Sequence, residues 1–170
     1  MAVNDLNGLL KHELGDLYFA EKTILKALKK MTKEVSDPAI NERMVQHQSE
    51  TEEQIANIEQ AFEAIGLKPR AQKCPGILGI LEEHDEFKEE EEPSKELLEA
   101  FDVGSGLRVE HYEIAAYRGA IALAKALGES DVADLLSRNL AQEVDMERFL
   151  AANGAKALKL AAREEQMVEA

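Results

Sequence analysis

Two glutamates near the end of the chain, Glu143 and Glu147, occupy positions where a core helix should carry apolar side chains. At about 100° per residue, they fall in the middle of a stripe roughly 80° wide on a helical wheel. The other members of this stripe are Val132, Leu136, Leu140, Leu150 and Gly154. A buried carboxylate is costly unless a cation meets it. We therefore predict that a positively charged partner lies beside this pair.

The other long helices that we expect also carry acids on their apolar faces. On the first helix this residue is Glu21, and on the second His47 lies near the centre of the stripe, with Glu50 at its edge. On the third helix Glu110 lies inside the stripe and Glu113 lies at its margin. Because no Lys or Arg is central on any of these stripes, protein cations do not neutralise the acids.

The inward acids also agree in depth along the helices. Turns are predicted near Asp37 and Gly128, and helices rise equally per residue, so counting away from each turn gives the level of each acid. Counting across the first turn from Glu21 reaches residue 52, between Glu50 and Gln54. Across the second turn, the level pairs are Glu113 with Glu143 and Glu110 with Glu147.

Six carboxylates and one imidazole are thus expected to converge at mid-bundle, a ligand set rich in oxygen. Such a set suits iron or manganese better than zinc, and two ions bridged by carboxylates would offset the charge. Bundle sites of this kind usually carry Glu-x-x-His on two helices. Here the order is reversed in His47-x-x-Glu50, and the last helix offers Glu143-x-x-x-Glu147. Taken singly, an inward glutamate can instead reach solvent along the helix edge, and His47 can be a hydrogen-bonded core residue.

The elements that must position these residues are helices throughout. Ala, Leu, Glu and Lys dominate the composition, and no segment alternates apolar and polar residues as a half-buried strand does. We predict helices at about 4–34, 38–65, 77–91, 94–127 and 130–154, with a helical tail at 155–170. Residues 1–154 then form an antiparallel four-helix bundle of two hairpins, 4–66 and 94–154. They are joined by a long crossover, 67–93, that contains the short extra helix, which is the ferritin-like connectivity.

Composition limits the functions further. The 170-residue chain has a net charge of −14, which disfavours nucleic acid and anionic lipid as partners. A single cysteine, Cys74, and a start without a signal-peptide pattern indicate a cytoplasmic protein, and no apolar run is long enough for a membrane span. The acidic stretch 82–92 is a solvated helix face in the simplest interpretation, and cation binding or a protein-partner surface are the alternatives.

Four segments resemble the YciE/YciF ferritin-like family. They are Asp-Leu-Tyr-Phe-Ala-Glu-Lys at 16–22, His-Gln-Ser-Glu-Thr at 47–51, Lys-Cys at 73–74 and Val-Glu-His-Tyr-Glu-Ile-Ala-Ala-Tyr at 109–117. The resemblance spans roughly residues 6–150. It implies a bacterial or archaeal cytoplasmic homodimer that has a rubrerythrin-like di-metal site, a link to stress responses and the family's ferroxidase label. The motifs carry over as metal ligands Glu21, His47, Glu50, Glu110, Glu113 and Glu143, with Glu147 at a position where the family often has Asp.

Two functions follow as hypotheses. In the first, two metal ions, iron or alternatively manganese, with zinc as a possible substitute, support ferroxidase or peroxide-linked activity. In the second, the chain is a non-catalytic, stress-induced structural or interaction protein, and its metal site is structural or vestigial. A DNA-protecting mini-ferritin fits poorly because nothing basic is available to meet phosphate.

Overall fold

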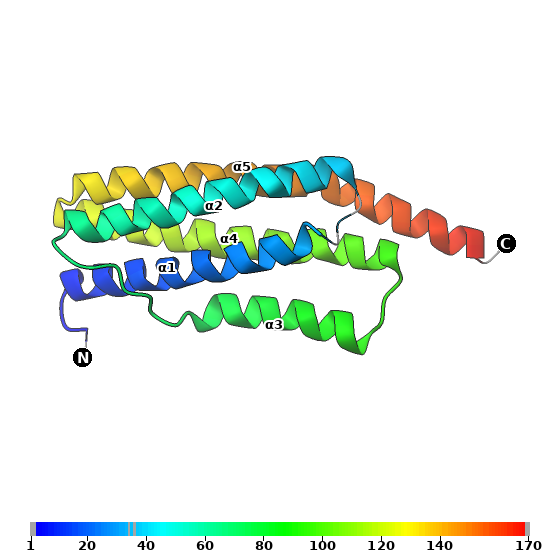
Figure 1. Cartoon of the computed structure of the whole chain (residues 1–170), viewed down its shortest axis with the longest axis horizontal. Helices are drawn as coiled ribbons and strands as arrows, with labels where there is room; N and C mark the ends of the chain where they lie inside the picture. Colours follow the sequence, from blue (N-terminus) through cyan, green and yellow to red (C-terminus); the bar gives the residue numbers. More distant parts are fainter. Residues whose placement is uncertain (1–2, 34, 36, 169–170) are drawn as a thin grey trace. The chain divides into compact units, whose positions relative to one another are not determined.

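The computed structural model describes residues 3–33, 35 and 37–168 and confirms the all-α prediction (Figure 1). The helices are α1 (Leu6–Met31), α2 (Pro38–Ala64), α3 (Pro75–Glu90), α4 (Lys95–Leu127) and α5 (Ser130–Val168). Over the described residues no strand is present. No helix in this part of the chain is long and apolar enough to cross a membrane.

The predicted turns are built by local sequence signals. The Asp37 side chain accepts hydrogen bonds from the backbone N–H groups of Ala39 (2.9 Å) and Ile40 (3.2 Å), so it caps α2 directly after the predicted turn. Gly66 (φ 73°) follows α2, and Gly128 (φ 78°) follows α4. A positive φ favours glycine, so both residues end their helices sharply.

Helix boundaries differ from the prediction at α1, α3 and α5, and α3 begins at Pro75 rather than at about residue 77. Helix α1 ends at Met31, whereas the predicted end, Glu34, lies outside the described residues, as does Ser36 of the predicted turn. The tail is helical as predicted, but it belongs to α5, which continues through Gly154 to Val168 without a break. A Cβ at Gly154 would lie 3.5 Å from Val103 Cγ1, an ordinary van der Waals contact, so this glycine neither opens a tight contact nor ends the helix.

The chain divides into two compact units. The first contains residues 1–74 and 113–143, and the second contains residues 75–112 and 144–170. Helices α4 and α5 are each divided, with one part in the first unit and the other part in the second.

The first unit is a four-helix bundle. Hydrogen bonds join Tyr18 to Glu59 and Lys29 to Glu52, so α1 and α2 are antiparallel. Hydrogen bonds also join Asn57 to Asn139 and Gln54 to Glu143, so α2 and α5 are antiparallel too. The first-unit parts of α4 and α5 are joined by the tight turn at Gly128, which leaves α4 parallel to α2. Residues 65–94, which include α3, therefore connect two parallel helices, as the predicted crossover requires. The apolar core includes Leu10, Leu14, Leu17, Ile58, Phe62, Tyr117, Ile121 and Leu136.

The second unit packs α3 against α4 through aromatic and charged contacts. Phe87 and Phe101 stack with ring centroids 3.8 Å apart, and His84 Nε2 lies 2.8 Å from Asp102 Oδ1. The acidic side chains of α3 are exposed, as a solvated face predicts. The adjoining tract at 91–92 is exposed as well.

Candidate metal centre

Buried acids from three helices and a buried histidine from the fourth meet within the first unit. Glu21 of α1, Glu113 of α4 and Glu143 of α5 are at most 1% exposed, and so is His47 of α2. Throughout the described part of the chain, no Lys or Arg is buried. Uncompensated carboxylate charge in a protein interior costs several kcal/mol per ion. This deficit of positive charge is the central electrostatic feature of the bundle.

His47 and Glu143 face each other across the bundle. His47 Nε2 lies 3.9 Å from Glu143 Oε2, and the two residues can contribute ligand atoms to one metal ion. The other oxygen of Glu143, Oε1, accepts a hydrogen bond from Gln54 Nε2. No hydrogen-bond donor among the described residues reaches Oε2. A buried carboxylate oxygen without a donor, opposite an imidazole nitrogen, is the arrangement expected of a metal ligand.

Glu21 is held by a tyrosine from α4, Tyr117. The Tyr117 hydroxyl donates to Glu21 Oε1 and accepts from Asn139 Nδ2 at 3.0 Å. Asn57 Nδ2 donates to Asn139 Oδ1 at 2.8 Å and anchors the network on α2. These hydrogen bonds fix one oxygen of Glu21, so the neighbouring side chains set the orientation of its carboxylate.

Burial and the nearby carboxylates shift the pKa values of two residues of the cluster, Glu21 and Tyr117. Burial, followed by the charge of Glu143, raises the pKa of Glu21 well above its usual range, and the hydrogen bond from Tyr117 offsets only part of this rise. Burial and the charges of Glu21, Glu113 and Glu143 raise the pKa of Tyr117 well above 10. Tyr117 therefore keeps its proton and acts as a hydrogen-bond donor.

Glu50 lies at the edge of the bundle, as its wheel position predicts, and its side chain is 16% exposed. Its Oε2 lies 2.8 Å from Arg43 NH1 and 3.0 Å from His47 Nδ1, and its Oε1 accepts from Gln46 Nε2 at 2.8 Å. Desolvation raises the pKa of Glu50, but the hydrogen bonds from His47, Arg43 and Gln46 and the charge of Arg43 outweigh it and lower the pKa to about 2. Both oxygens of Glu50 are therefore engaged by protein groups.

The remaining predicted ligands, Glu110 and Glu147, lie on the second-unit parts of α4 and α5. Each lies one helical turn from Glu113 or Glu143 on the same continuous helix, so each pair shares a helix face. Glu110 is buried, in agreement with its place inside the stripe. Glu147 is 23% exposed and its Oε1 lies 3.8 Å from His111 Nε2, so it is less central than its wheel position suggested.

Several functional neighbours were not predicted from the sequence. Gln54, Asn57 and Asn139 are buried beside the carboxylates, and Arg43 pairs with Glu50. The signal was present for Asn139, because it lies four residues before Glu143 on the same helix face. Arg43 offered a similar signal, because it lies four residues before His47 and seven before Glu50 on the same helix.

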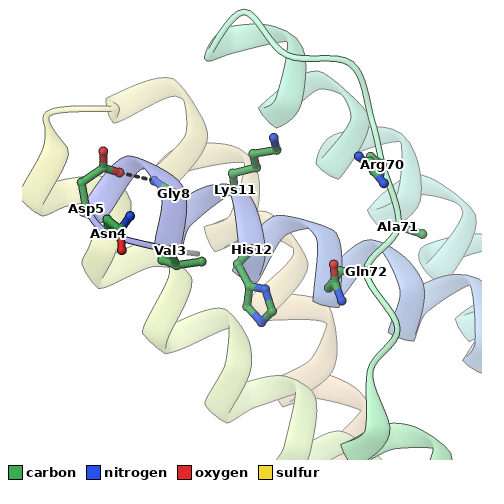
Figure 2. A pocket seen from close by; sticks show the side chains of 9 residues that line it. All are labelled: Val3, Asn4, Asp5, Gly8, Lys11, His12, Arg70, Ala71 and Gln72. Carbon is green, nitrogen blue, oxygen red and sulfur yellow. Dashed lines mark hydrogen bonds between the residues drawn. The ribbon is translucent and has the colours of Figure 1, made fainter. Parts of the chain in front are cut away.

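A pocket elsewhere on the first unit does not compete with this cluster. It encloses about 380 Å³ between the start of α1 and residues 70–72. Figure 2 shows that Lys11 and His12 point in different directions and that Arg70 projects from the separate 70–72 segment. These basic groups do not converge on one point, and no carboxylate of the cluster lines the pocket.

Comparison with known proteins places this architecture in a family. The sequence profile of a domain of unknown function, DUF892, matches residues 5–163. The chain belongs to the DUF892 family. It is 34% identical to protein YciF of Escherichia coli K12 over 144 residues, covering 84% of this chain and 86% of YciF. The resemblance to the YciE/YciF family is thereby confirmed.

Solved structures of similar proteins support the same fold. The crystal structure of the E. coli stress protein YciF superposes with a TM-score of 0.84 at 31% identity, covering 92% of this chain and 98% of YciF. YcfI of Rhodopseudomonas palustris, which is proposed to be a structural protein, also gives 0.84 at 37% identity, over 88% of this chain and 94% of YcfI. A Xanthomonas campestris protein gives 0.77 at 25% identity, over 95% and 99% of the two chains.

Proposed function

We propose that this DUF892 member is a di-metal carboxylate protein whose metals are iron, with manganese as the alternative and zinc as a substitute. The proposed ligands in the first unit are Glu21, His47, Glu113 and Glu143. Glu110 and Glu147, one turn away on α4 and α5, are the further proposed ligands. Glu50, the remaining member of the predicted set, contacts His47 Nδ1 through its Oε2.

The observation that carries the proposal is the oxygen of Glu143 that faces His47. Bonds from a zinc-like divalent ion to an imidazole nitrogen and to a carboxylate oxygen are each about 2.1 Å long. The 3.9 Å gap between His47 Nε2 and Glu143 Oε2 is too long for a hydrogen bond, and each residue would offer one of these atoms to a bound ion. A cation there also supplies the positive charge that the buried acids lack.

The chemistry proposed for the bound metals is oxidation of ferrous ion by oxygen or peroxide. The protein contributes charge, orientation and exclusion of water: Gln54 holds Glu143, Tyr117 holds Glu21, and the apolar bundle limits access. Tyr117 keeps its hydroxyl proton on the side of Glu21, where it stabilises the ionised carboxylate.

The test is metal content and ferrous oxidation. We expect wild-type protein incubated anaerobically with ferrous ion to bind two ions per chain and to oxidise them on admission of air. Glu143→Gln should lose both properties. Glu53→Gln is the matched control, because Glu53 lies at the surface, where it accepts from Gln142 Nε2 at 3.0 Å. Wild-type protein that binds no metal under these conditions would refute the proposal.

The alternative is a non-catalytic role, which the designation of YcfI as a proposed structural protein favours. Tight metal binding without ferrous oxidation would support this alternative. In either case we propose a cytoplasmic homodimer that acts in a stress response, by analogy with the E. coli stress protein YciF. The exposed acids of residues 82–92 are the proposed surface for a further protein partner.

A further inference from the structure

The contacts of His47 distinguish its two ring nitrogens. The imidazole is 1% exposed; Nε2 faces Glu143, whereas Nδ1 lies 3.0 Å from Glu50 Oε2. An ionised carboxylate accepts hydrogen bonds and cannot donate them. In a neutral imidazole, the proton must therefore be on Nδ1 to satisfy this contact, and Nε2 presents its lone pair toward Glu143.

Glu50 is itself held in place by two further side chains of α2, Arg43 and Gln46. Arg43 NH1 lies 2.8 Å from the same Oε2 that contacts His47, and Gln46 Nε2 donates to Oε1 at 2.8 Å. All three partners come from the same helix, α2, as Glu50. This fixes the carboxylate by local geometry and engages both of its oxygens with protein donors.

We propose that Glu50, fixed by Arg43, is a positioning residue that holds His47 with Nε2 directed at the metal, and that Glu50 is not itself a metal ligand. This inference rests on the proposed metal centre and revises the role that the sequence pattern suggests for Glu50. A carboxylate behind a ligating histidine sets the tautomer and the orientation of the ring. The i,i+3 spacing of His47-x-x-Glu50 suits this role, because it brings the carboxylate within 3.0 Å of Nδ1.

The first measurement requires no metal. Nitrogen-15 NMR of the imidazole in metal-free protein at neutral pH reports which ring nitrogen carries the proton. We expect the Nδ1–H form of His47 in wild type and in Glu50→Gln, whose amide oxygen still accepts a hydrogen bond. In Glu50→Ala we expect a mixture of tautomers. An Nε2–H form in the wild type would overturn the proposal.

The second measurement is the affinity for Mn²⁺, a redox-stable probe, by calorimetry. Loss of a carboxylate that orients a ligating histidine costs about 10–100-fold in affinity, so Glu50→Ala should fall in this range. Glu50→Gln should remain within about threefold of wild type, since it keeps the acceptor. Circular dichroism confirms folding, and Glu53→Gln on the same helix is the control for a surface charge change.

The outcomes distinguish the role of Glu50 from the existence of the metal centre. If Glu50→Gln loses as much Mn²⁺ affinity as Glu143→Gln, Glu50 is a ligand and the inference is wrong. If wild type binds no Mn²⁺ and no ferrous ion, the proposed metal centre fails. In that event the tautomer measurement still decides whether Glu50 positions His47.

Discussion

Replacing Glu143 by glutamine should stabilise the metal-free protein while removing its response to metal. Glu143 is fully buried, and its charge contributes to the raised pKa of Glu21. Glutamine has nearly the same shape and can still accept the hydrogen bond from Gln54 with its amide oxygen. Its amide N–H₂ would face His47 Nε2, where the carboxylate oxygen of wild type has no donor.

The magnitude follows from the cost of the buried charge. Removing an inadequately compensated buried charge stabilises by about 1–3 kcal/mol, at the lower end of the penalty for a buried ion. For a chain of this size, 1 kcal/mol shifts Tm by roughly 2–4 °C, so a gain of about 2 kcal/mol raises Tm by roughly 4–8 °C. In wild type, metal at about 100 times its Kd should add about 2.7 kcal/mol, and Glu143→Gln should lose most of this gain.

The assay is thermal unfolding with chelator and with Mn²⁺, for wild type, Glu143→Gln and Glu53→Gln. The surface variant should stay within about 0.5 kcal/mol of wild type and keep the full metal response. The reasoning is refuted if metal-free Glu143→Gln is less stable than wild type and both proteins gain equally from Mn²⁺. That result would mean that the carboxylate is satisfied within the protein and does not await a cation.

Three further perturbations test other parts of the structure. Tyr117→Phe removes the donor to Glu21 and should cost about 1–3 kcal/mol of stability and about 10–100-fold in Mn²⁺ affinity, measured by urea unfolding and calorimetry. The hydrogen bond to Asp102 raises the pKa of His84. This pair should therefore stabilise the fold below the unfolded pKa of about 6.5, and the stabilisation should be lost as pH rises through the folded pKa. The difference in unfolding free energy between wild type and Asp102→Asn across this pH range measures the effect. Gly128→Ala should cost about 1–2 kcal/mol in urea unfolding, because φ is 78° there.

Each of these perturbations has a contrary outcome. Unchanged Mn²⁺ affinity in Tyr117→Phe would show that Tyr117 does not orient a ligand. A stability difference between wild type and Asp102→Asn that grows with pH would reverse the sign expected for His84. The control for Gly128→Ala is Gly119→Ala, a helical position with open space, which should stabilise by roughly 0.5–1 kcal/mol. Equal effects at both glycines would contradict the argument from positive φ.

The helical hairpins and most inward residues follow from local rules. Asp37 caps α2, and Gly66 and Gly128 end helices where predicted, because caps and positive φ depend only on nearby residues. The wheel also identified Glu21 and Glu143 as buried, since a helix fixes which residues share a face. Gly154 misled the prediction of the helix end, because an isolated glycine within a helix is tolerated and α5 continues through it.

The sequence by itself determined that this chain is helical, acidic and supplied with inward carboxylates that lack buried Lys or Arg partners. Only the tertiary structure decided how these groups are held: Tyr117 meets Glu21, Gln54 meets Glu143, and His47 turns Nε2 toward Glu143. The physical reason is that periodicity along one helix gives the direction of a side chain. The atom that it meets depends on the packing distance, register and rotamers of several helices at once.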